Sequence, residues 1–246
     1  MGIAVVIKTF LREQPIIDLV ESIEKELPEA RIYIADDSGE ISTKKNELYE
    51  RLRANGHKII LMPFDSGLPA GRNACINEVK EEYILLCDDD FVISDGECIR
   101  KTIKKLTKGV DIICGRLYKE NGEMYNDYIY RVEIKDSTLI RHPLPSVWSK
   151  IDIGLNFFVA KSKVIKSIMW DAELKLIGEH PDFFMRAKNV YFDPEMTAIH
   201  KEVENTKEYR SFRSRTEFLG PFSKKWGVKK EIVAGEKFRL IYKGNK

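Results

Sequence analysis

The chain of 246 residues is 43% hydrophobic and 33% charged, with a formal net charge of +2. This balance is typical of a water-soluble globular protein and excludes a disordered chain. The first apolar run, from Ile3 to Ile7, ends at Lys8 and is too short for a signal peptide core or for a membrane span of about 20 residues. We therefore expect a soluble, cytoplasmic protein that folds as a single domain.

The four cysteines form no CxxC pair and show no spacing typical of metal ligands. They are Cys75, Cys87, Cys98 and Cys114. In a chain of this length we expect them to be reduced structural thiols, which agrees with a cytoplasmic location.

Apolar runs alternate with amphipathic stretches through the first half of the chain. The predicted strands lie at 3–7, 31–35, 58–62 and 83–87, and the predicted helices at 14–26, 43–54 and 70–80. The strands are nearly continuous in Val, Ile and Leu, as expected for parallel strands covered on both faces. The sequence thus predicts an α/β fold with an open, doubly wound, mostly parallel sheet. A helix from about 95 to 107, a strand at 111–114, and hairpins with a long loop over 115–150 should follow.

Ligands of such sheets bind beyond the carboxyl ends of the strands, and polar residues stand at three of these ends. Lys8-Thr9 follows the first predicted strand, Asp36-Asp37-Ser38-Gly39 the second, and Asp88-Asp89-Asp90 the fourth. All three segments should therefore meet at one site.

The three carboxylates from Asp88 to Asp90 directly follow a buried strand, where they lose hydration and repel one another. A hard divalent ion such as Mg²⁺ or Mn²⁺, carrying a diphosphate on its other coordination positions, would compensate them. The alternative is a solvated acidic turn, which the hydrophobic strand before it disfavours.

Two further segments suit a nucleotide. A carboxylate at Asp37 can accept the ring N–H of a uracil base. The segment from Gly67 to Asn73 opens a helix, where Arg72 can pair with phosphate or with the neighbouring carboxylates and where backbone N–H groups are exposed. The glycine spacing fits neither a Walker loop nor a Rossmann fingerprint.

Together these segments resemble family 2 glycosyltransferases with the GT-A fold. Asp36–Gly39 matches the DDGS-like element of that family, Gly71–Asn73 the ARN-like element and Asp88–Asp90 the DxD element. The resemblance implies the following donor-site roles: Asp37 binds the base, Thr9 and Arg72 support the nucleotide, Asp88 contacts ribose or a metal-bound water, and Asp90 ligates Mn²⁺ or Mg²⁺. Asn73 and Asp89 are expected among the donor-binding residues.

Within the family, the segments 7–12, 90–91, 156–158 and 180–184 look most like the β-1,4-N-acetylgalactosaminyltransferases of the ganglioside and Sd(a) type. The resemblance extends over residues 3–210 and implies a UDP-sugar donor, with UDP-N-acetylgalactosamine the first candidate. UDP-galactose, UDP-glucose and UDP-N-acetylglucosamine stay open. The acceptor, a glycan or glycoconjugate, stays open too, because this chain shows no membrane anchor or stem.

In inverting members of the family, an acid at the start of a helix in the second half removes the acceptor proton. The segment from Gly178 to Phe184 is the matching place, and it offers Asp182, Glu179 and His180, in that order of preference. The alternative for Asp182 is a helix cap, a common role for Asp.

The resemblance also suggests His200, at the end of an apolar stretch, as a metal ligand, since several related transferases place a histidine there. A lone histidine is more often only a satisfied surface or core residue. Asn156 is expected to bind the donor or acceptor sugar. Trp148 and Trp170 either stack on a sugar ring or pack in the core.

The last part of the chain is basic: residues 201–246 hold 13 Lys and Arg against 6 Asp and Glu, whereas residues 1–200 hold 28 against 33. Its aromatic residues are Tyr209, Phe212, Phe218, Phe222, Trp226, Phe238 and Tyr242. This composition suits a peripheral contact with the inner face of a membrane or with an acidic acceptor, and equally a solvated amphipathic helix. We expect no nucleic-acid partner.

The sequence therefore predicts a metal-dependent inverting glycosyltransferase. Residues 1–115 form the half that binds the nucleotide sugar, 116–200 the acceptor and catalytic half, and 201–246 a basic helical extension. One alternative is a nucleotidyltransferase, although the glycine-rich basic loop that it needs after the first strand is missing. Another is a non-catalytic module that binds nucleic acid or membrane through its tail.

Overall fold

The computed structural model describes residues 2–125, 129–214, 219–235 and 240–241, so Phe218, Phe238 and Tyr242 lie outside the described residues. The strands are β1 (Ile3–Thr9), β2 (Arg31–Asp36), β3 (Lys58–Leu61), β4 (Tyr83–Asp88), β5 (Phe91–Val92), β6 (Ile112–Lys119), β7 (Tyr130–Lys135), β8 (Thr138–Pro143), β9 (Ser149–Ile151), β10 (Phe158–Lys161), β11 (Val190–His200), β12 (Lys230–Val233) and β13 (Leu240–Ile241). The helices are α1 (Gln14–Glu26), α2 (Thr43–Ala54), α3 (Leu68–Glu78), α4 (Gly96–Lys104), α5 (Ser162–Ile168), α6 (Glu179–Arg186), α7 (Lys207–Arg213) and α8 (Leu219–Trp226).

The main sheet has the order β3-β2-β1-β4-β10-β6-β11-β5, with β9 paired to β11. β3, β2, β1 and β4 are parallel neighbours, whereas β10 runs antiparallel between β4 and β6. The predicted α/β fold with a mostly parallel sheet is thus confirmed. β2 and β3 lie on one side of β1, and β4 lies on its other side, so the strand order reverses between β1 and β4. The carboxyl ends of these two strands therefore form the switch point of the sheet.

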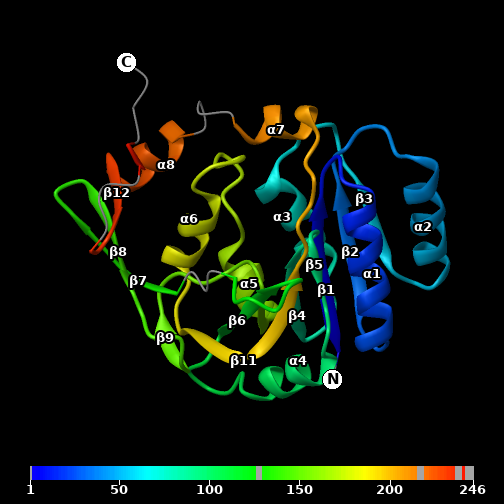
Figure 1. The fold of residues 1–246 in the computed structure, drawn as a ribbon, viewed down its shortest axis with the longest axis horizontal. Coiled ribbons are helices and arrows are strands. Elements are labelled where there is room, and N and C mark those ends of the chain that lie inside the picture. The colour runs from blue at the N-terminus through cyan, green and yellow to red at the C-terminus, as the bar shows by residue number, and fades with distance from the viewer. Residues whose placement is uncertain (1, 126–128, 215–218, 236–239, 242–246) are drawn as a thin grey trace.

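Alternate residues of the central strands face opposite layers. Ile3, Val5 and Ile7 pack with α1, α2 and α4, while Ala4 and Val6 pack with α3, α5 and α6. Figure 1 shows the sheet with helices on both sides. Both layers are apolar because the strands are buried on both faces, as the continuous Val, Ile and Leu runs predicted.

Local sequence sets several helix ends. Ser42 caps α2 by accepting a hydrogen bond from the Lys45 N–H, and Asp95 caps α4 by accepting bonds from the N–H groups of Glu97 and Cys98. The predicted bounds of α1 and α2 are confirmed. The helix expected from about 95 to 107 ends at Lys104, and the strand expected at 111–114 continues to Lys119 because it pairs with β11.

The C-terminal extension is only partly helical. After α7 and α8 the chain forms β12 and β13, and β12 pairs with β8 in a second sheet of order β13-β12-β8-β7. Phe222 of α8 and Val228 lie in a small core with Leu139 and Leu174. This part of the extension therefore packs against β8 and Leu174 and does not form a separate solvated helix.

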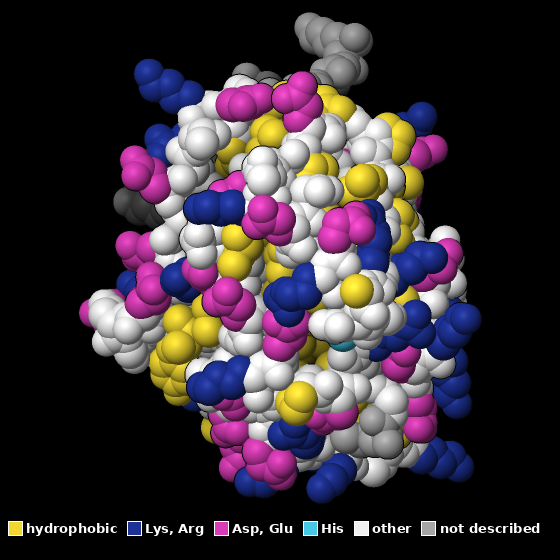
Figure 2. Space-filling model, turned by 90° about the vertical axis from the view of Figure 1, so that its right-hand side faces the viewer, with side chains coloured by type: hydrophobic (Ala, Val, Ile, Leu, Met, Phe, Trp, Pro, Cys, Tyr) yellow, Lys and Arg dark blue, Asp and Glu magenta, His cyan; other side chains and the backbone are white. Residues whose placement is uncertain are grey.

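No helix among the described residues is long and apolar enough to span a membrane. All four cysteines are free and buried. Figure 2 shows a face on which acidic and basic side chains intermingle without a region of one sign.

Candidate donor-binding and catalytic site

The polar residues at the strand ends meet, as predicted, at the carboxyl ends of β1, β2 and β4. Lys8 lies opposite Asp88 in the β1–β4 pairing, and Thr9 lies opposite Asp36 in the β1–β2 pairing. The register of the parallel strands therefore brings together residues about 80 positions apart in the chain.

The three carboxylates are compensated by two arginines of the chain. Nη1 of Arg12 donates to Asp89 Oδ1 at 2.7 Å and to Asp90 Oδ2 at 2.8 Å. Nη2 of Arg72 donates to Asp88 Oδ1 at 2.8 Å, and the Thr9 hydroxyl donates to Asp89 Oδ2 at 2.7 Å. The sequence predicted a cation at this place, but it assigned no role to Arg12.

Asp90 and His200 lie next to each other because β5 pairs with the end of β11. His200 stands opposite Phe91, and the Lys201 N–H donates to the Asp90 carbonyl at 2.9 Å. Nε2 of His200 is 3.7 Å from Asp90 Oδ2, and its ring stacks on Tyr125. Burial, with the negative charges of Asp89 and Asp88, raises the pKa of the Asp90 carboxyl to about 6.

This donor set can hold a divalent cation only with help from a ligand. Among the described residues no group of three or more His, Cys, Asp or Glu side chains is arranged to bind a metal. A carboxylate, however, suits Mn²⁺ and Mg²⁺, and a neutral imidazole is a common metal ligand in proteins. Mg²⁺ is commonly held by one or two carboxylates, with waters and substrate phosphates completing its coordination. Asp90 and His200 fit such a site.

Asp36 and Asp37 have different surroundings. Asp36 accepts hydrogen bonds from the Tyr49 hydroxyl at 2.6 Å and pairs with Lys45 at 2.6 Å, so it has a structural role. Asp37, only 1% exposed, pairs with Lys8 Nζ at 2.5 Å and accepts from the Gly67 N–H at 2.9 Å. Burial lowers the pKa of Lys8 although Asp37 opposes the shift.

Arg72 connects Asp88, at the end of β4, with Glu179 in the first turn of α6. It is 1% exposed, and its Nη1 lies 3.6 Å from Glu179 Oε1. Its guanidinium also lies over the ring of Trp170, 5.5 Å from the centroid. Burial raises the pKa of Glu179, while the positive charge of Arg72 acts in the opposite direction.

Asp182, the first choice for the base, is held elsewhere. It has no exposed surface, and Arg186 pairs with its Oδ2 at 2.8 Å. Its Oδ1 is paired with Lys225 at 2.7 Å and accepts the Trp226 indole N–H at 3.0 Å. Oδ1 thus fastens α8 to α6, while Oδ2 is occupied by Arg186 of the same helix, and the geometry favours Glu179 over Asp182 as a base.

His180 and Asn156 lie together, with His180 Nδ1 2.8 Å from Asn156 Oδ1. Burial, with the positive charges of Arg141 and Arg72, lowers the pKa of His180 to about 3, so the imidazole is neutral at working pH. Asn73 is occupied by the backbone of Trp170, donating to its carbonyl at 2.7 Å and accepting its N–H at 2.8 Å. Trp170 itself packs in the core, whereas Trp148 is 43% exposed.

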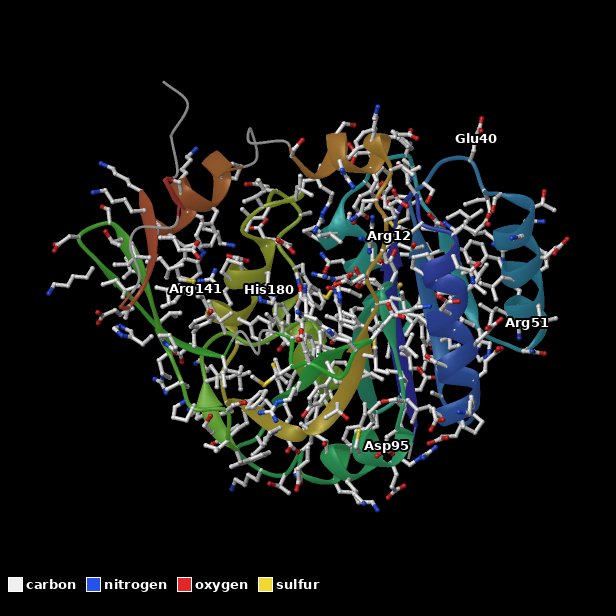
Figure 3. All side chains as sticks on the ribbon, viewed as in Figure 1. Arg12, Glu40, Arg51, Asp95, Arg141 and His180 are labelled. Carbon is white, nitrogen blue, oxygen red and sulfur yellow. The ribbon has the colours of Figure 1, made fainter. Side chains whose placement is uncertain are left out.

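Helix α7 lies over the donor side of the site, above α3 and the ends of the central strands (Figure 1). Tyr209, Phe212 and Arg213 of α7 close a cavity of about 50 Å³ that Lys8, Asp37 and Asp89 also line. In Figure 3, Arg12 lies below α7 and His180 on the α6 side, whereas Asp95 lies at the opposite end of the sheet. Small-molecule pockets have volumes of about 300–1,000 Å³, so this cavity, with α7 in its present place, is smaller than a typical ligand site.

Open α/β sheets bind their ligands at the switch point, where this chain places its acids, and comparison of the fold identifies the kind of domain. The chain is similar to two structures of Staphylococcus aureus TarS, residues 1–349, and each match covers 91% of this chain and 64% of TarS 1–349. The TM-score is 0.63 at 17% identity for the first structure. It is 0.64 at 15% identity for the complex with UDP. The fold is thus of the GT-A type. The glycosyl transferase family 2 model matches residues 4–166, and the chain belongs to that family.

One curated relative is mouse β-1,4 N-acetylgalactosaminyltransferase 2. It is 28% identical to this chain over 192 residues, which cover 74% of this chain and 35% of the relative. Human β-1,4 N-acetylgalactosaminyltransferase 1 is 26% identical over 196 residues, with the same two shares. An uncharacterized glycosyltransferase of Bacillus subtilis strain 168, YwdF, is 33% identical over 112 residues, 45% of this chain and 39% of the relative. The chain spans about a third of the length of these curated relatives.

Sequence reasoning gave Arg12 no role at the site. A signal for it was present, since three adjoining carboxylates require positive partners and Arg12 closely follows the first strand. Tyr209 and Phe212 were expected only among the aromatic residues of a basic tail that faces lipid or an acceptor, and their place at the cavity beside Lys8, Asp37 and Asp89 depends on the path of the chain after β11.

Proposed function

We propose that this chain is a metal-dependent, inverting glycosyltransferase that transfers a sugar from a UDP-sugar to a hydroxyl of a glycan or glycoconjugate. One observation carries the proposal: Arg72 contacts Asp88 on its donor side and Glu179 on its acceptor side. A single buried guanidinium thus separates the acids of the donor site from a carboxylate suited to act as base.

The donor half, residues 1–115, supplies the nucleotide site. Asp37 is proposed to bind the base, with Thr9 and Asp89 below the ribose and Asp88 and Arg72 beside the diphosphate. Asn73 supports the nucleotide site indirectly, because its side chain holds α3 against the backbone of Trp170. Support for UDP comes from the TarS complexes with UDP and UDP-GlcNAc, and the names of the curated relatives make UDP-N-acetylgalactosamine the first donor to test.

The acceptor half, residues 116–200, supplies Glu179, with His180 and Asn156 beside it. The acceptor oxygen attacks the anomeric carbon and forms the new C–O bond, and its proton passes to the Glu179 carboxylate. The bond from the anomeric carbon to the diphosphate oxygen breaks, and UDP departs with the electron pair. Arg72 stabilises the charge that develops on the diphosphate.

Asp90 and His200 would hold the Mn²⁺ or Mg²⁺ ion, with Asp88 near it. A bound divalent ion supplies a Lewis acid for the leaving diphosphate.

We also propose a cytoplasmic location, with the C-terminal extension held against an anionic membrane surface. Lys224, Lys229 and Lys230 are exposed and would contact the membrane. Lys225 is not counted among them, since it is paired with Asp171 and Asp182.

A thermal-shift panel tests the donor class, because a ligand that binds only the folded state raises the melting temperature. UDP, GDP, CDP and four UDP-sugars are each measured with Mn²⁺ and with chelator. Stabilisation by UDP that requires Mn²⁺ supports the proposal. If GDP or CDP stabilises better than UDP, the proposed donor is wrong. Release of UDP from each sugar donor, with a panel of glycan acceptors, then identifies the sugar.

A further inference from the structure

We propose that Arg12 occupies the position of the divalent cation in the free protein and competes with it for Asp89 and Asp90. The inference rests on the proposed metal-dependent function. It assigns a role to a residue that the sequence analysis placed in a family-like segment without a function and that the proposed reaction does not use.

The contacts of Arg12 are those of an internal counter-ion. One nitrogen, Nη1, donates to both Asp89 and Asp90, and on Asp90 it contacts Oδ2, the oxygen that faces His200. A cation ligated by His200 and by Oδ2 of Asp90 must therefore displace the guanidinium from that oxygen. Two positive charges cannot share that oxygen at ligand distance without strong repulsion.

One nitrogen of the Arg12 side chain, the buried Nε, finds no hydrogen-bond acceptor among the described residues. Arg12 also lines a cavity of about 450 Å³, whose other charged lining residues are Glu13, Asp18, Glu202, Glu204 and Lys201, the last paired with Asp18. Carboxylates outnumber the lysine in this lining, so the cavity offers acidic partners to a displaced guanidinium.

Arg12 also connects the acids to the segment that covers the donor side. Its Nη2 donates to Asn205 Oδ1 at 3.1 Å, and its guanidinium lies over the Tyr209 ring at 4.5 Å. Removal of Arg12 from Asp89 and Asp90 therefore loosens the link between the strand ends and α7. Metal binding and opening of the nucleotide site are expected to be coupled through this side chain.

The test measures Mn²⁺ binding to the purified, chelator-treated protein from the loss of the free-ion electron paramagnetic resonance signal. The variants are Arg12→Gln, which removes the charge, and Arg12→Lys, which keeps the charge but cannot bridge two carboxylates in the same way. Lys201→Gln is the matched control, because it removes a nearby positive charge that pairs with Asp18 and not with the three acids. Asp90→Asn in the Arg12→Gln background shows whether binding is at this site.

We expect Arg12→Gln to bind Mn²⁺ about tenfold more tightly than the unchanged protein, Arg12→Lys to lie between the two, and Lys201→Gln to change affinity less than about threefold. In chelator, Arg12→Gln should melt at a lower temperature, and Mn²⁺ should restore it. Equal or weaker binding by a folded Arg12→Gln overturns the inference, while Mn²⁺-dependent UDP binding by the unchanged protein leaves the proposed function intact. If neither protein binds Mn²⁺ at millimolar concentration with UDP present, the metal-dependent function itself is wrong, and the inference with it.

Discussion

The two acids of α6 can be separated by a pair of isosteric substitutions, Glu179→Gln and Asp182→Asn. Glu179 faces Arg72 in the site, whereas Asp182 is buried under Arg186, Lys225 and Trp226. The first substitution should therefore remove a base, and the second should remove a structural connection.

Loss of a positioned general base lowers turnover by about 10²–10⁴-fold. Glu179→Gln should therefore reduce kcat by this factor and leave UDP binding unchanged. Asp182→Asn leaves two cations without a full counter-charge. Breaking such a pair costs about 3–5 kcal/mol when both partners are buried. Because Arg186 and Lys225 are 26% and 33% exposed, solvent screening reduces our expectation to about 2 kcal/mol. For a domain of this size that is a drop of about 4–8 °C in melting temperature.

The assay combines UDP release at saturating donor and acceptor with melting temperature and UDP affinity for each variant. A folded Asp182→Asn protein should keep most of its turnover at a temperature well below its melting point. If instead Asp182→Asn abolishes transfer at an unchanged melting temperature while Glu179→Gln stays active, Asp182 is the base and the argument from its buried contacts is refuted.

Three further predictions follow from particular contacts. Burial raises the pKa of Glu179, and a general base must be ionised to act. A plot of kcat/KM against pH should therefore fall on the acid side with a pKa above the usual glutamate value of about 4.3. The residual activity of Glu179→Gln should not show this acid-side fall. Gly71→Ala places a Cβ 2.5 Å from a β1 lysine side chain and should cost about 1–3 kcal/mol of unfolding free energy in urea titrations, whereas Gly220→Ala, which meets nothing within 4 Å, should cost much less. Tyr49→Phe leaves buried Asp36 without a 2.6 Å hydrogen bond and should lower the unfolding free energy by about 1.5–3 kcal/mol; no change would show that this bond contributes little.

The sequence by itself determined the helices and strands of the first half and the end of the sheet at which the polar residues of the candidate site meet. Continuous Val, Ile and Leu runs specify buried parallel strands through local periodicity, and the acids at Asp37 and Asp88–Asp90 stand directly after two of these strands. Both signals lie within a few residues of one another along the chain, so no tertiary information was needed to read them. Family membership, confirmed by the match over residues 4–166, was legible from the same segments.

Tertiary structure decided which partners these acids have. Arg12 contacts residues 77 and 78 positions away, and Lys225 and Trp226 reach Asp182 from another helix. Glu179 and Asp182 are three residues apart and equivalent to any local pattern, yet only Glu179 contacts Arg72. The difference arises because sheet order and helix docking determine long-range contacts, and these depend on packing between segments that local periodicity does not encode.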